Sequence, residues 1–257
     1  MPIITLTSDW GLKDFYAAAF KGSLLSKCPE AQLVDICHGV SKFDVQQGSF
    51  IFKNAYRHFP KGTVHAICIK PQSDHDIEPL AFALEGHYFV GLNDGFFSLV
   101  FDEMPEYAYI PAPSGEPFPS FDVKAIAWAA AGLASGKPIE KIGRRCQAYE
   151  TKSHLHPVIE ENLIKGSVIY IDEFENAVTN ISRPLFDRIR QGRCYEIYVR
   201  GGEYHIDTIR ERYHQEARSN MVALFNSANM LEVGISQGNA ASLIGLGFGD
   251  TIRVEFR

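Results

Sequence analysis

The sequence predicts an α/β fold, in which a layered α/β domain with a parallel-rich sheet precedes a small, mostly antiparallel β domain. Two observations favour this. In the first 100 residues short β-branched runs alternate with amphipathic segments, the pattern of parallel strands joined by crossover helices. After about residue 162 many short strand-like runs with turn signals follow one another, which indicates a small barrel or sandwich. The 257 residues can bury the cores of two such domains without disulfides or a structural metal.

The first half contains predicted strands and helices in alternation. Apolar residues spaced at helical intervals predict helices over 16–24 and 52–59, and Pro29 and Pro60 follow closely, where proline ends a helix. The strands expected around these helices are 3–6, 32–36, 63–69, 80–84 and 88–91.

The segment 105–119 carries five prolines, too many for a helix or a central strand, so it is predicted as a long ordered loop or a surface excursion. A helix is expected to begin near Asp122, with an alanine-rich body at 125–134. The polar stretch 150–161 is the predicted linker, which gives domains at 1–155 and 162–257. The strands expected in the second domain are 168–171, 194–199, 204–209, 221–225, 231–235 and 251–256.

Charge and cysteine content restrict the class of protein. The net charge of -6, with no basic run beyond Arg144-Arg145, argues against nucleic-acid binding and favours a small-molecule partner. The five cysteines form no CxxC pair, which is typical of reduced thiols in a cytoplasmic protein. The opening MPIITLTSDWG has neither a basic region nor a long apolar run, so no membrane association is expected.

Candidate ligand-binding residues follow the predicted strands, because open parallel sheets bind ligands beyond the carboxyl ends of their strands. Three places qualify: Ser8-Asp9, the run 70–74, and Asn93-Asp94-Gly95. The Asp9 carboxylate can accept two hydrogen bonds from the vicinal diol of a ribose. The alternative is that Asp9 only caps a turn.

Other motifs give no support for a metal or a phosphate site. His154 and His156 lie two residues apart without a nearby cysteine or carboxylate pattern, and are interpreted as surface residues. No glycine-rich phosphate loop and no GxSxG nucleophile motif follow a predicted strand. No metal is therefore expected.

Several blocks of the chain, spread over nearly its whole length, resemble one known family. They are TSDWGLKDFYAAAFKG, VDICHGVSKFDVQQGSFIFKNAYRHFPKGTVHAICIKP, IDEFENAVTNIS, FNSANMLEVGISQGNAA and LGFGD. Together they are similar to the S-adenosylmethionine (SAM) hydroxide adenosyltransferases and the SAM-dependent fluorinases and chlorinases.

The resemblance implies a Rossmann-like N-terminal domain, a small C-terminal antiparallel β-barrel, and a homotrimer that holds SAM between subunits. It implies an in-line displacement at C5′ of the ribose of SAM, which gives adenosine plus methionine when water attacks. The sulfonium is already a good leaving group, so the protein chiefly positions and desolvates the nucleophile. SAM is then a substrate or ligand, and no further cofactor is expected.

The resemblance also implies ligand-binding residues. Asp9 falls at the position of the ribose-binding aspartate and Phe43 at that of an aromatic packed along the ligand. In the second domain the matching residues are Asp172, Phe174 and Asn176 for the methionine amino group and adenine edge, Ser227 for the methionine carboxylate, and Asn239 and Ala240, whose backbone would face the adenine. The alternative is that these residues of the second domain only form barrel turns.

The sequence departs from the family at the residues that orient the attacking water. Hydrolytic members carry an Asp, an Arg and a His in the motifs Asp-Pro-Gly-Val-Gly followed by Arg, and Phe-His-Gly-Arg-Asp. Here these motifs read KPQSD at 70–74 with Ile77, and FDVKA at 121–125. Lys70, Ser73 and Asp122 stand at the positions of the lost family residues and are the candidate catalytic residues. A Lys70/Asp122 pair would hold a water, or it would be a structural ion pair or two solvated residues that are not in contact.

Three hypotheses follow from these departures. The first is an adenosyl-binding protein whose substitution at C5′ is lost, slowed or altered. The second is a non-catalytic trimeric nucleoside-binding sensor or scaffold, and the third is an enzyme that uses another nucleophile positioned by Lys70.

Overall fold

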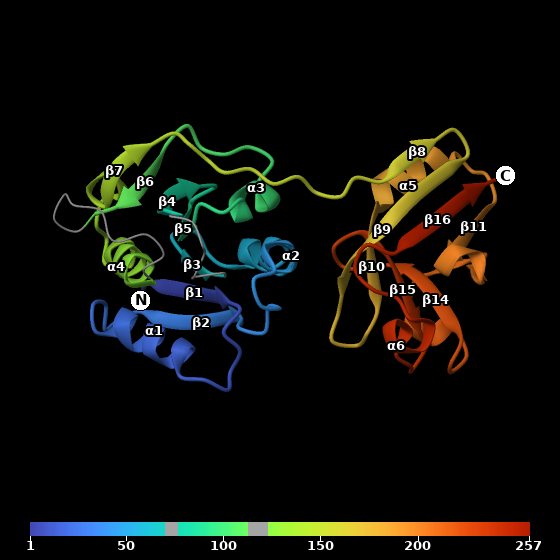
Figure 1. Ribbon diagram of the computed structural model, residues 1–257, viewed down its shortest axis with the longest axis horizontal. Helices are drawn as coiled ribbons and strands as arrows, with labels where there is room; N and C mark the ends of the chain where they lie inside the picture. The colour runs from blue at the N-terminus through green and yellow to red at the C-terminus, as the bar shows by residue number, and fades with distance from the viewer. Residues whose placement is uncertain (70–76, 113–122) are drawn as a thin grey trace. The chain divides into compact units, whose positions relative to one another are not determined.

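The computed structural model describes residues 1–69, 77–112 and 123–257. Contacts divide the chain into two compact units, Met1–Ser153 and His154–Arg257, each described here by itself. In Figure 1 the first unit runs from blue to yellow-green and the second from yellow to red. The predicted fold class is confirmed: the first unit is a layered α/β structure with a parallel-rich sheet, and the second is built on a nearly closed, barrel-like sheet.

The first unit is organised around one sheet, with the strand order β2-β1-β3-β5-β4-β6-β7 in its described part. The strands β2, β1, β3 and β5 run parallel to one another. Strand β4 pairs antiparallel with β5 and with β6, and β6 pairs antiparallel with β7. Because β1 lies between β2 and β3, the chain winds first to one side of β1 and then to the other. The strands are β1 (Ile3–Ser8), β2 (Gln32–Cys37), β3 (Val64–Cys68), β4 (Pro79–Leu84), β5 (His87–Leu92), β6 (Ala108–Pro111) and β7 (Gly143–Cys146).

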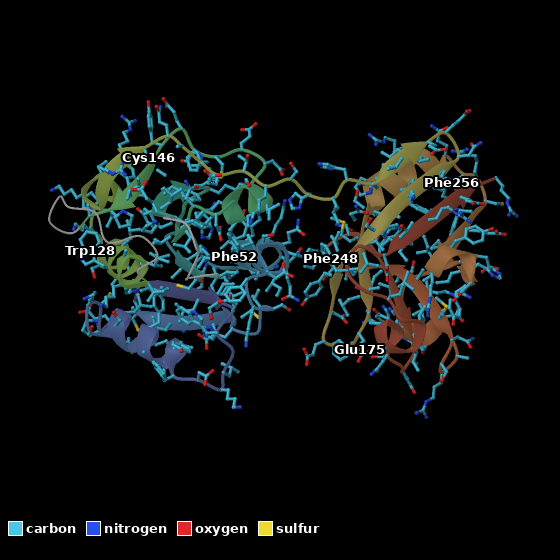
Figure 2. All side chains as sticks on the ribbon, in the orientation of Figure 1. Phe52, Trp128, Cys146, Glu175, Phe248 and Phe256 are labelled. Atoms are coloured by element: carbon cyan, nitrogen blue, oxygen red, sulfur yellow. The ribbon has the colours of Figure 1, made fainter. Side chains whose placement is uncertain are left out.

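Helices cover both faces of this sheet. Helices α1 (Tyr16–Leu25) and α4 (Val123–Ala134) share a core with Val64, Ala66 and Cys68 of β3. Helices α2 (Val45–Lys53) and α3 (Phe96–Val100) share the other core with Ile67 of the same strand. Successive side chains of a strand point to opposite faces, so the unit has three layers. Figure 2 labels Trp128 on α4 and Phe52 on α2, which pack in the two different cores.

The helix predicted at 52–59 was placed too late in the chain. The helix α2 begins after Asp44, whose carboxylate accepts a hydrogen bond from the Gln47 amide at 2.9 Å, and it ends at Lys53. A separate 3₁₀ turn, Tyr56–His58, follows. The Phe52 and Tyr56 rings stack at 5.3 Å across this break, so their apolar spacing persists although the helix does not.

The prediction that 105–119 contains no strand was also wrong, because Ala108–Pro111 forms β6 between β4 and β7. Pro111 is the last residue of that strand, where a missing N–H costs the ladder little. Residues 113–122, which include the rest of that segment and the expected helix start at Asp122, lie outside the described residues.

The second unit is a mostly antiparallel sheet, with the order β12-β11-β16-β9-β10-β15-β14-β13 and β8 paired to β9. Strand β8 falls inside the predicted 150–161 linker, and β10 and helix α5 were not anticipated. Its elements are β8 (Val158–Glu160), β9 (Leu163–Ile171), β10 (Ala177–Ser182), α5 (Arg183–Arg190), β11 (Tyr195–Val199), β12 (Tyr204–Ile206), β13 (Ile209–Arg210), β14 (Met221–Phe225), β15 (Met230–Ile235), α6 (Ala240–Ile244) and β16 (Thr251–Phe256). Short 3₁₀ turns occur at Ile139–Lys141 in the first unit and at Arg200–Gly202 and Tyr213–Gln215 in the second.

Two features are absent from the described ranges of the chain. No helix there has the length and apolar character needed to cross a bilayer. No group of three or more His, Cys, Asp or Glu side chains there is arranged to hold a metal ion.

A buried polar chain crosses the core of the first unit. The Thr5 Oγ1 lies 2.7 Å from His65 Nδ1, and His65 Nε2 lies 3.2 Å from His87 Nδ1. Burial, and secondarily the charge of His87, lowers the pKa of His65 from its ordinary 6.5 to about 3. The imidazole is therefore neutral in the folded protein at neutral pH.

We predict that this histidine makes the protein less stable at mildly acidic pH. The unfolded chain binds a proton near pH 6.5 and the folded chain only near pH 3, so the free energy of unfolding falls as the pH decreases through that window. Between pH 7 and pH 5 the loss should be about 2 kcal/mol, measured by urea unfolding. The double variant Thr5→Val/His65→Phe removes the hydroxyl and the titrating ring together and should lose most of this difference. An unchanged pH dependence in the double variant would show that His65 does not cause it.

Candidate functional site

The carboxyl ends of three parallel strands meet where Asp9 lies. Ser8, the last residue of β1, pairs with Cys68 at the end of β3, and Thr7 pairs with Cys37 at the end of β2. Because β1 is the strand at which the winding direction changes, this is the crevice in which open α/β sheets place ligands. Asp9 is 8% exposed, so its carboxylate is held at the edge of the sheet and not in bulk solvent.

The Asp9 carboxylate is fixed by the segment that follows β2. Its Oδ2 accepts a hydrogen bond of 2.9 Å from the backbone amide of Phe43. Phe43 has a φ of 66°, an uncommon left-handed conformation for a residue with a side chain, and its ring is 60% exposed. The structure thus brings together the two residues of the first unit that were predicted to bind an adenosyl ligand.

Burial strongly raises the pKa of the neighbouring Cys68 thiol, and the charge of Asp9 raises it further. Cys68 is therefore a neutral thiol and not a nucleophile.

The other predicted positions of the first unit are Lys70, Ser73, Asp122 and the turn Asn93-Asp94-Gly95. Lys70, Ser73 and Asp122 lie outside the described residues. The turn Asn93-Asp94-Gly95 has structural contacts: Asn93 hydrogen bonds to the backbone of Ala148 and Glu150, and Asp94 Oδ1 accepts from the Phe96 amide at the start of α3.

In the second unit, Asp172 organises the turn between β9 and β10. Its Oδ1 accepts from the amides of Phe174 and Asn176 at 2.9 and 2.8 Å, and its Oδ2 accepts from Asn176 Nδ2 at 3.0 Å. The Phe174 side chain is 77% exposed, whereas Asn176 is 6% exposed. The turn thus presents an aromatic ring to solvent and holds the amide of Asn176 in place.

Glu175, which sequence reasoning missed, ties this turn to helix α6. Its carboxylate accepts hydrogen bonds from the Ser242 amide at 2.9 Å and from Asn239 Nδ2 at 3.3 Å, and its carbonyl accepts from the Ala241 amide. The Ser242 hydrogen bonds lower the pKa of this exposed carboxylate. Asn239 is exposed, while the Ala240 side chain is buried in the barrel core, so only the backbone of Ala240 can face a ligand.

A second network, also missed, surrounds the buried carboxylate of Glu232 on β15. It accepts hydrogen bonds from the Tyr213 hydroxyl at one oxygen and from Asn226 Nδ2, at 2.8 Å, at the other. Burial, followed by the hydrogen bond and charge of Glu232, raises the pKa of Tyr213, so its phenol remains a donor. Asn226 Oδ1 accepts in turn from the amides of Ala228 and Met230, which fixes the turn that carries the exposed Ser227.

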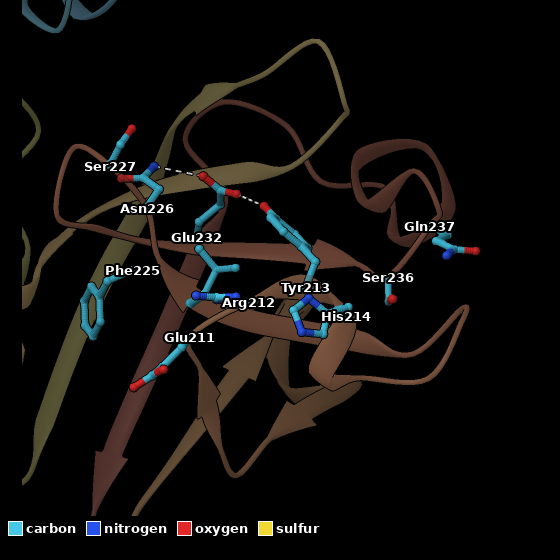
Figure 3. A pocket seen from close by; sticks show the side chains of 11 residues that line it. Glu211, Arg212, Tyr213, His214, Phe225, Asn226, Ser227, Glu232, Ser236 and Gln237 are labelled. Carbon is cyan, nitrogen blue, oxygen red and sulfur yellow. Dashed lines mark hydrogen bonds between the residues drawn. The ribbon is translucent and has the colours of Figure 1, made fainter.

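These groups surround a cavity of about 630 Å³ on the barrel (Figure 3). The figure shows Tyr213 and Asn226 converging on Glu232, with Ser227 beside Asn226 and His214 below Tyr213. Its lining is Glu211, Arg212, Tyr213, His214, Leu224, Phe225, Asn226, Ser227, Glu232, Ser236 and Gln237.

Asn176 adjoins this network at Gly234. A Cβ on Gly234 would lie 2.6 Å from Asn176 Oδ1 and 2.9 Å from Tyr213 Cε1, so both side chains pack against the bare backbone there. The predicted residues Asp172, Asn176 and Ser227 are therefore linked through Tyr213, Glu232 and Asn226. Taken separately, the sheet edge at Asp9 offers a carboxylate, which suits a diol or an ammonium, and the barrel cluster offers hydroxyl and amide groups, which suit a carboxylate or a base edge.

Models of two protein domains match the chain, the SAM hydroxide adenosyltransferase N-terminal domain over residues 4–143 and the corresponding C-terminal domain over residues 166–253. Relatives include the (R)-S-adenosyl-L-methionine hydrolase of Methanocaldococcus jannaschii, 26% identical with 100% of this chain and 97% of that protein covered. The hydrolase of the same name from Thermus thermophilus is 28% identical, with 96% and 97% covered. A fluorinase from Nocardia brasiliensis is 29% identical, with 74% and 75% covered.

Solved structures with the same fold include an uncharacterised protein from Thermotoga maritima, with a TM-score of 0.84, 25% identity, and 98% of this chain and 99% of that chain covered. A protein from Thermus thermophilus matches with a TM-score of 0.76, 27% identity and full coverage of both chains. The two domain models account for most of the 257 residues, in the order expected of the family. The chain belongs to the SAM hydroxide adenosyltransferase family.

Proposed function

We propose that this protein binds SAM or a related adenosyl ligand, and that the in-line substitution at C5′ of SAM is lost, slowed or altered. In this proposal Asp9 accepts hydrogen bonds from the ribose diol and Phe43 packs along the ligand. Asp172, Phe174, Asn176 and Ser227 bind the methionine part and the adenine edge, and the backbone of Asn239 and Ala240 faces the base. The assembly is a homotrimer with an inter-subunit site and without a resident cofactor.

The observation that carries this proposal is the fixed carboxylate of Asp9 at the edge where β1 changes the winding of the sheet. A ribose diol donates two hydrogen bonds, and an ionised carboxylate can accept both while its Oδ2 also accepts from the Phe43 amide. The barrel supports the proposal with polar groups that are held in place by protein contacts: Asn176 against Gly234, and Ser227 on the turn fixed by Asn226.

The altered chemistry follows from the sequence at the family's water-orienting motifs. Hydrolysis forms a C5′–O bond with water as the C5′–S bond breaks, methionine leaves, and the water loses a proton. At the positions that match the Asp, Arg and His with which hydrolytic members orient this water, the motifs at 70–77 and 121–125 carry other residues. With Lys70, Ser73 and Asp122 instead, water lacks that orientation, and orientation is a large part of the catalysis of a displacement.

The absence of these three residues equally supports a second function, a trimeric nucleoside sensor or scaffold without turnover. The two functions differ in one measurement. Incubation with SAM followed by mass spectrometry detects adenosine, methionine or a halogenated nucleoside if substitution occurs. Slow product formation supports altered catalysis, binding without product supports the sensor, and rapid release of adenosine contradicts both.

We predict that Asp9→Asn weakens the binding of adenosine at least tenfold, because the amide carries no charge and replaces one acceptor oxygen by a donor. A hydrogen bond to a charged group contributes about 1.5–3 kcal/mol, which corresponds to tenfold or more in the dissociation constant. Isothermal calorimetry with adenosine measures the change. The control is Asp102→Asn in the same unit, whose side chain is 98% exposed and which should bind adenosine as the wild type does. Equal affinities for all three proteins would remove Asp9 from the site.

We predict that Gly234→Ala damages the barrel half of the site. The added methyl would meet Asn176 and Tyr213 at less than 3 Å and displace them, at a cost of about 1–3 kcal/mol in unfolding free energy, and SAM affinity should fall about tenfold. Gly22→Ala in helix α1 is the control, since its Cβ would meet nothing within 4 Å. That change should raise stability by about 0.5–1 kcal/mol and leave SAM binding unaltered. Thermal unfolding and calorimetry provide both measurements, and wild-type affinity in the Gly234 variant would contradict the role of Asn176.

A further inference from the structure

The segment that carries Asp9 is attached to one buried histidine, His38. Ser8, directly before Asp9, places its Oγ 2.6 Å from His38 Nδ1, and Gly11, two residues after Asp9, donates its amide to the His38 carbonyl at 2.7 Å. Both Ser8 and His38 are buried, at 1% and 4% exposed. The side chain and the backbone carbonyl of His38 thus hold the chain on both sides of Asp9.

The ring of His38 is held from its other side by an ion pair at the surface. His38 Nε2 lies 3.1 Å from Asp35 Oδ1, and Lys21 Nζ donates to Asp35 Oδ2 at 2.6 Å. The Nε2–H does not point straight at the oxygen, so this is a close polar contact and not a linear hydrogen bond. Partial burial raises the pKa of Asp35, but the polar contacts with Lys21 and His38 outweigh it and leave that pKa below its ordinary value.

The charge state of Asp35 decides the direction of the hydrogen bonds. An ionised carboxylate is only an acceptor, so the tautomer of His38 that suits this contact is the one with its hydrogen on Nε2. Nδ1 then accepts from the Ser8 hydroxyl, and the Ser8 oxygen accepts the Trp10 amide at 3.4 Å. The chain Lys21–Asp35–His38–Ser8 therefore has one consistent order of donors and acceptors, running from helix α1 across the end of β2 to the end of β1.

We propose that His38 is a positioning residue for nucleoside binding, which sets the direction of the Asp9 carboxylate through Ser8 and Gly11. This inference rests on the proposed function, because it gives His38 a role only if Asp9 binds a ribose. His38 does not touch the ligand. It fixes the backbone from which Asp9 projects, while the amide of Phe43, five residues after His38, fixes the carboxylate itself.

Two substitutions separate the contacts of the ring, because the amide of Asn reaches about as far as Nδ1 and that of Gln about as far as Nε2. His38→Asn keeps a partner for Ser8, whereas His38→Gln removes it. Ser8→Ala removes the same contact from the other side. Asp35→Ala releases the outer nitrogen at a position where the side chain is 40% exposed, so it leaves the core intact. The matched control is Asp102→Ala, which breaks an exposed ion pair with Lys53 in the same unit.

The readout is the difference in affinity between adenosine and 2′,3′-dideoxyadenosine, which lacks the diol, measured by calorimetry. The wild type should prefer adenosine. The affinity of the His38→Gln and Ser8→Ala variants should fall about tenfold for adenosine and should not change for the dideoxy analogue. The affinity of the Asp35→Ala variant for adenosine should fall about threefold. The affinities of the His38→Asn and Asp102→Ala variants should remain near that of the wild type.

A role confined to folding would weaken both nucleosides together, so a parallel loss overturns the proposal. It is overturned also if the wild type discriminates and the His38→Gln and Ser8→Ala variants discriminate equally well. A wild type that binds neither adenosine nor SAM refutes the proposed function itself, and the role of His38 with it. The two failures are therefore distinguishable by the behaviour of the wild type.

Discussion

The hydrogen bond from the Phe43 amide to the Asp9 carboxylate joins the chain after β1 to the chain after β2 at the carboxyl edge of the sheet. Strand β1 is buried between two helical layers, and the half-buried edge strand β2 packs Leu33 against one core and Ile36 against the other, so neither segment can shift without disturbing a core. The left-handed backbone of Phe43 is strained for a residue with a side chain, and it points the amide at the acid. The position of the Asp9 carboxylate thus depends on the packing of the first unit.

The barrel repeats the same principle with different residues. Glu232 is a buried acid whose two oxygens are already used by Tyr213 and Asn226, so it is a structural acceptor and not a ligand-binding group. Its effect is transmitted through Asn226 to the turn that carries Ser227. Glu175 does the same for the turn around Asn176 and the start of α6. In both units a carboxylate that accepts backbone or side-chain donors sets the direction of its neighbours.

The sequence was a good guide to elements whose side chains are uniformly buried. Strands β1 and β3 are short apolar, β-branched runs, and their signal survives because both faces are covered by helices. It was a poor guide to β10, where Thr179 hydrogen bonds to the Leu231 carbonyl and Asn180 accepts from the Ser167 amide. Polar side chains satisfied inside a barrel look like loop residues when only the order of residues is known.

The same limit applies to the site. Asp9 was predicted from its place after a strand, which is a property of the chain order. Glu175 acts through partners 64 and 67 residues away, and Tyr213 reaches Glu232 over 19 residues, separations that local patterns do not encode. Glu232 carried one usable signal, an acid within the otherwise apolar strand run 230–235, which should be read as a buried acceptor in need of donors.

The contacts that orient Asp9, Asn176 and Ser227 are all internal to their own unit. Under the proposed function, little conformational entropy is lost at these side chains when a nucleoside binds, since protein contacts already fix them. The affinity of a preformed site depends on how closely the ligand matches the fixed positions of its binding groups. A small change in the ligand, such as the loss of one hydroxyl, should therefore reduce the binding free energy by nearly the whole contribution of the lost contact.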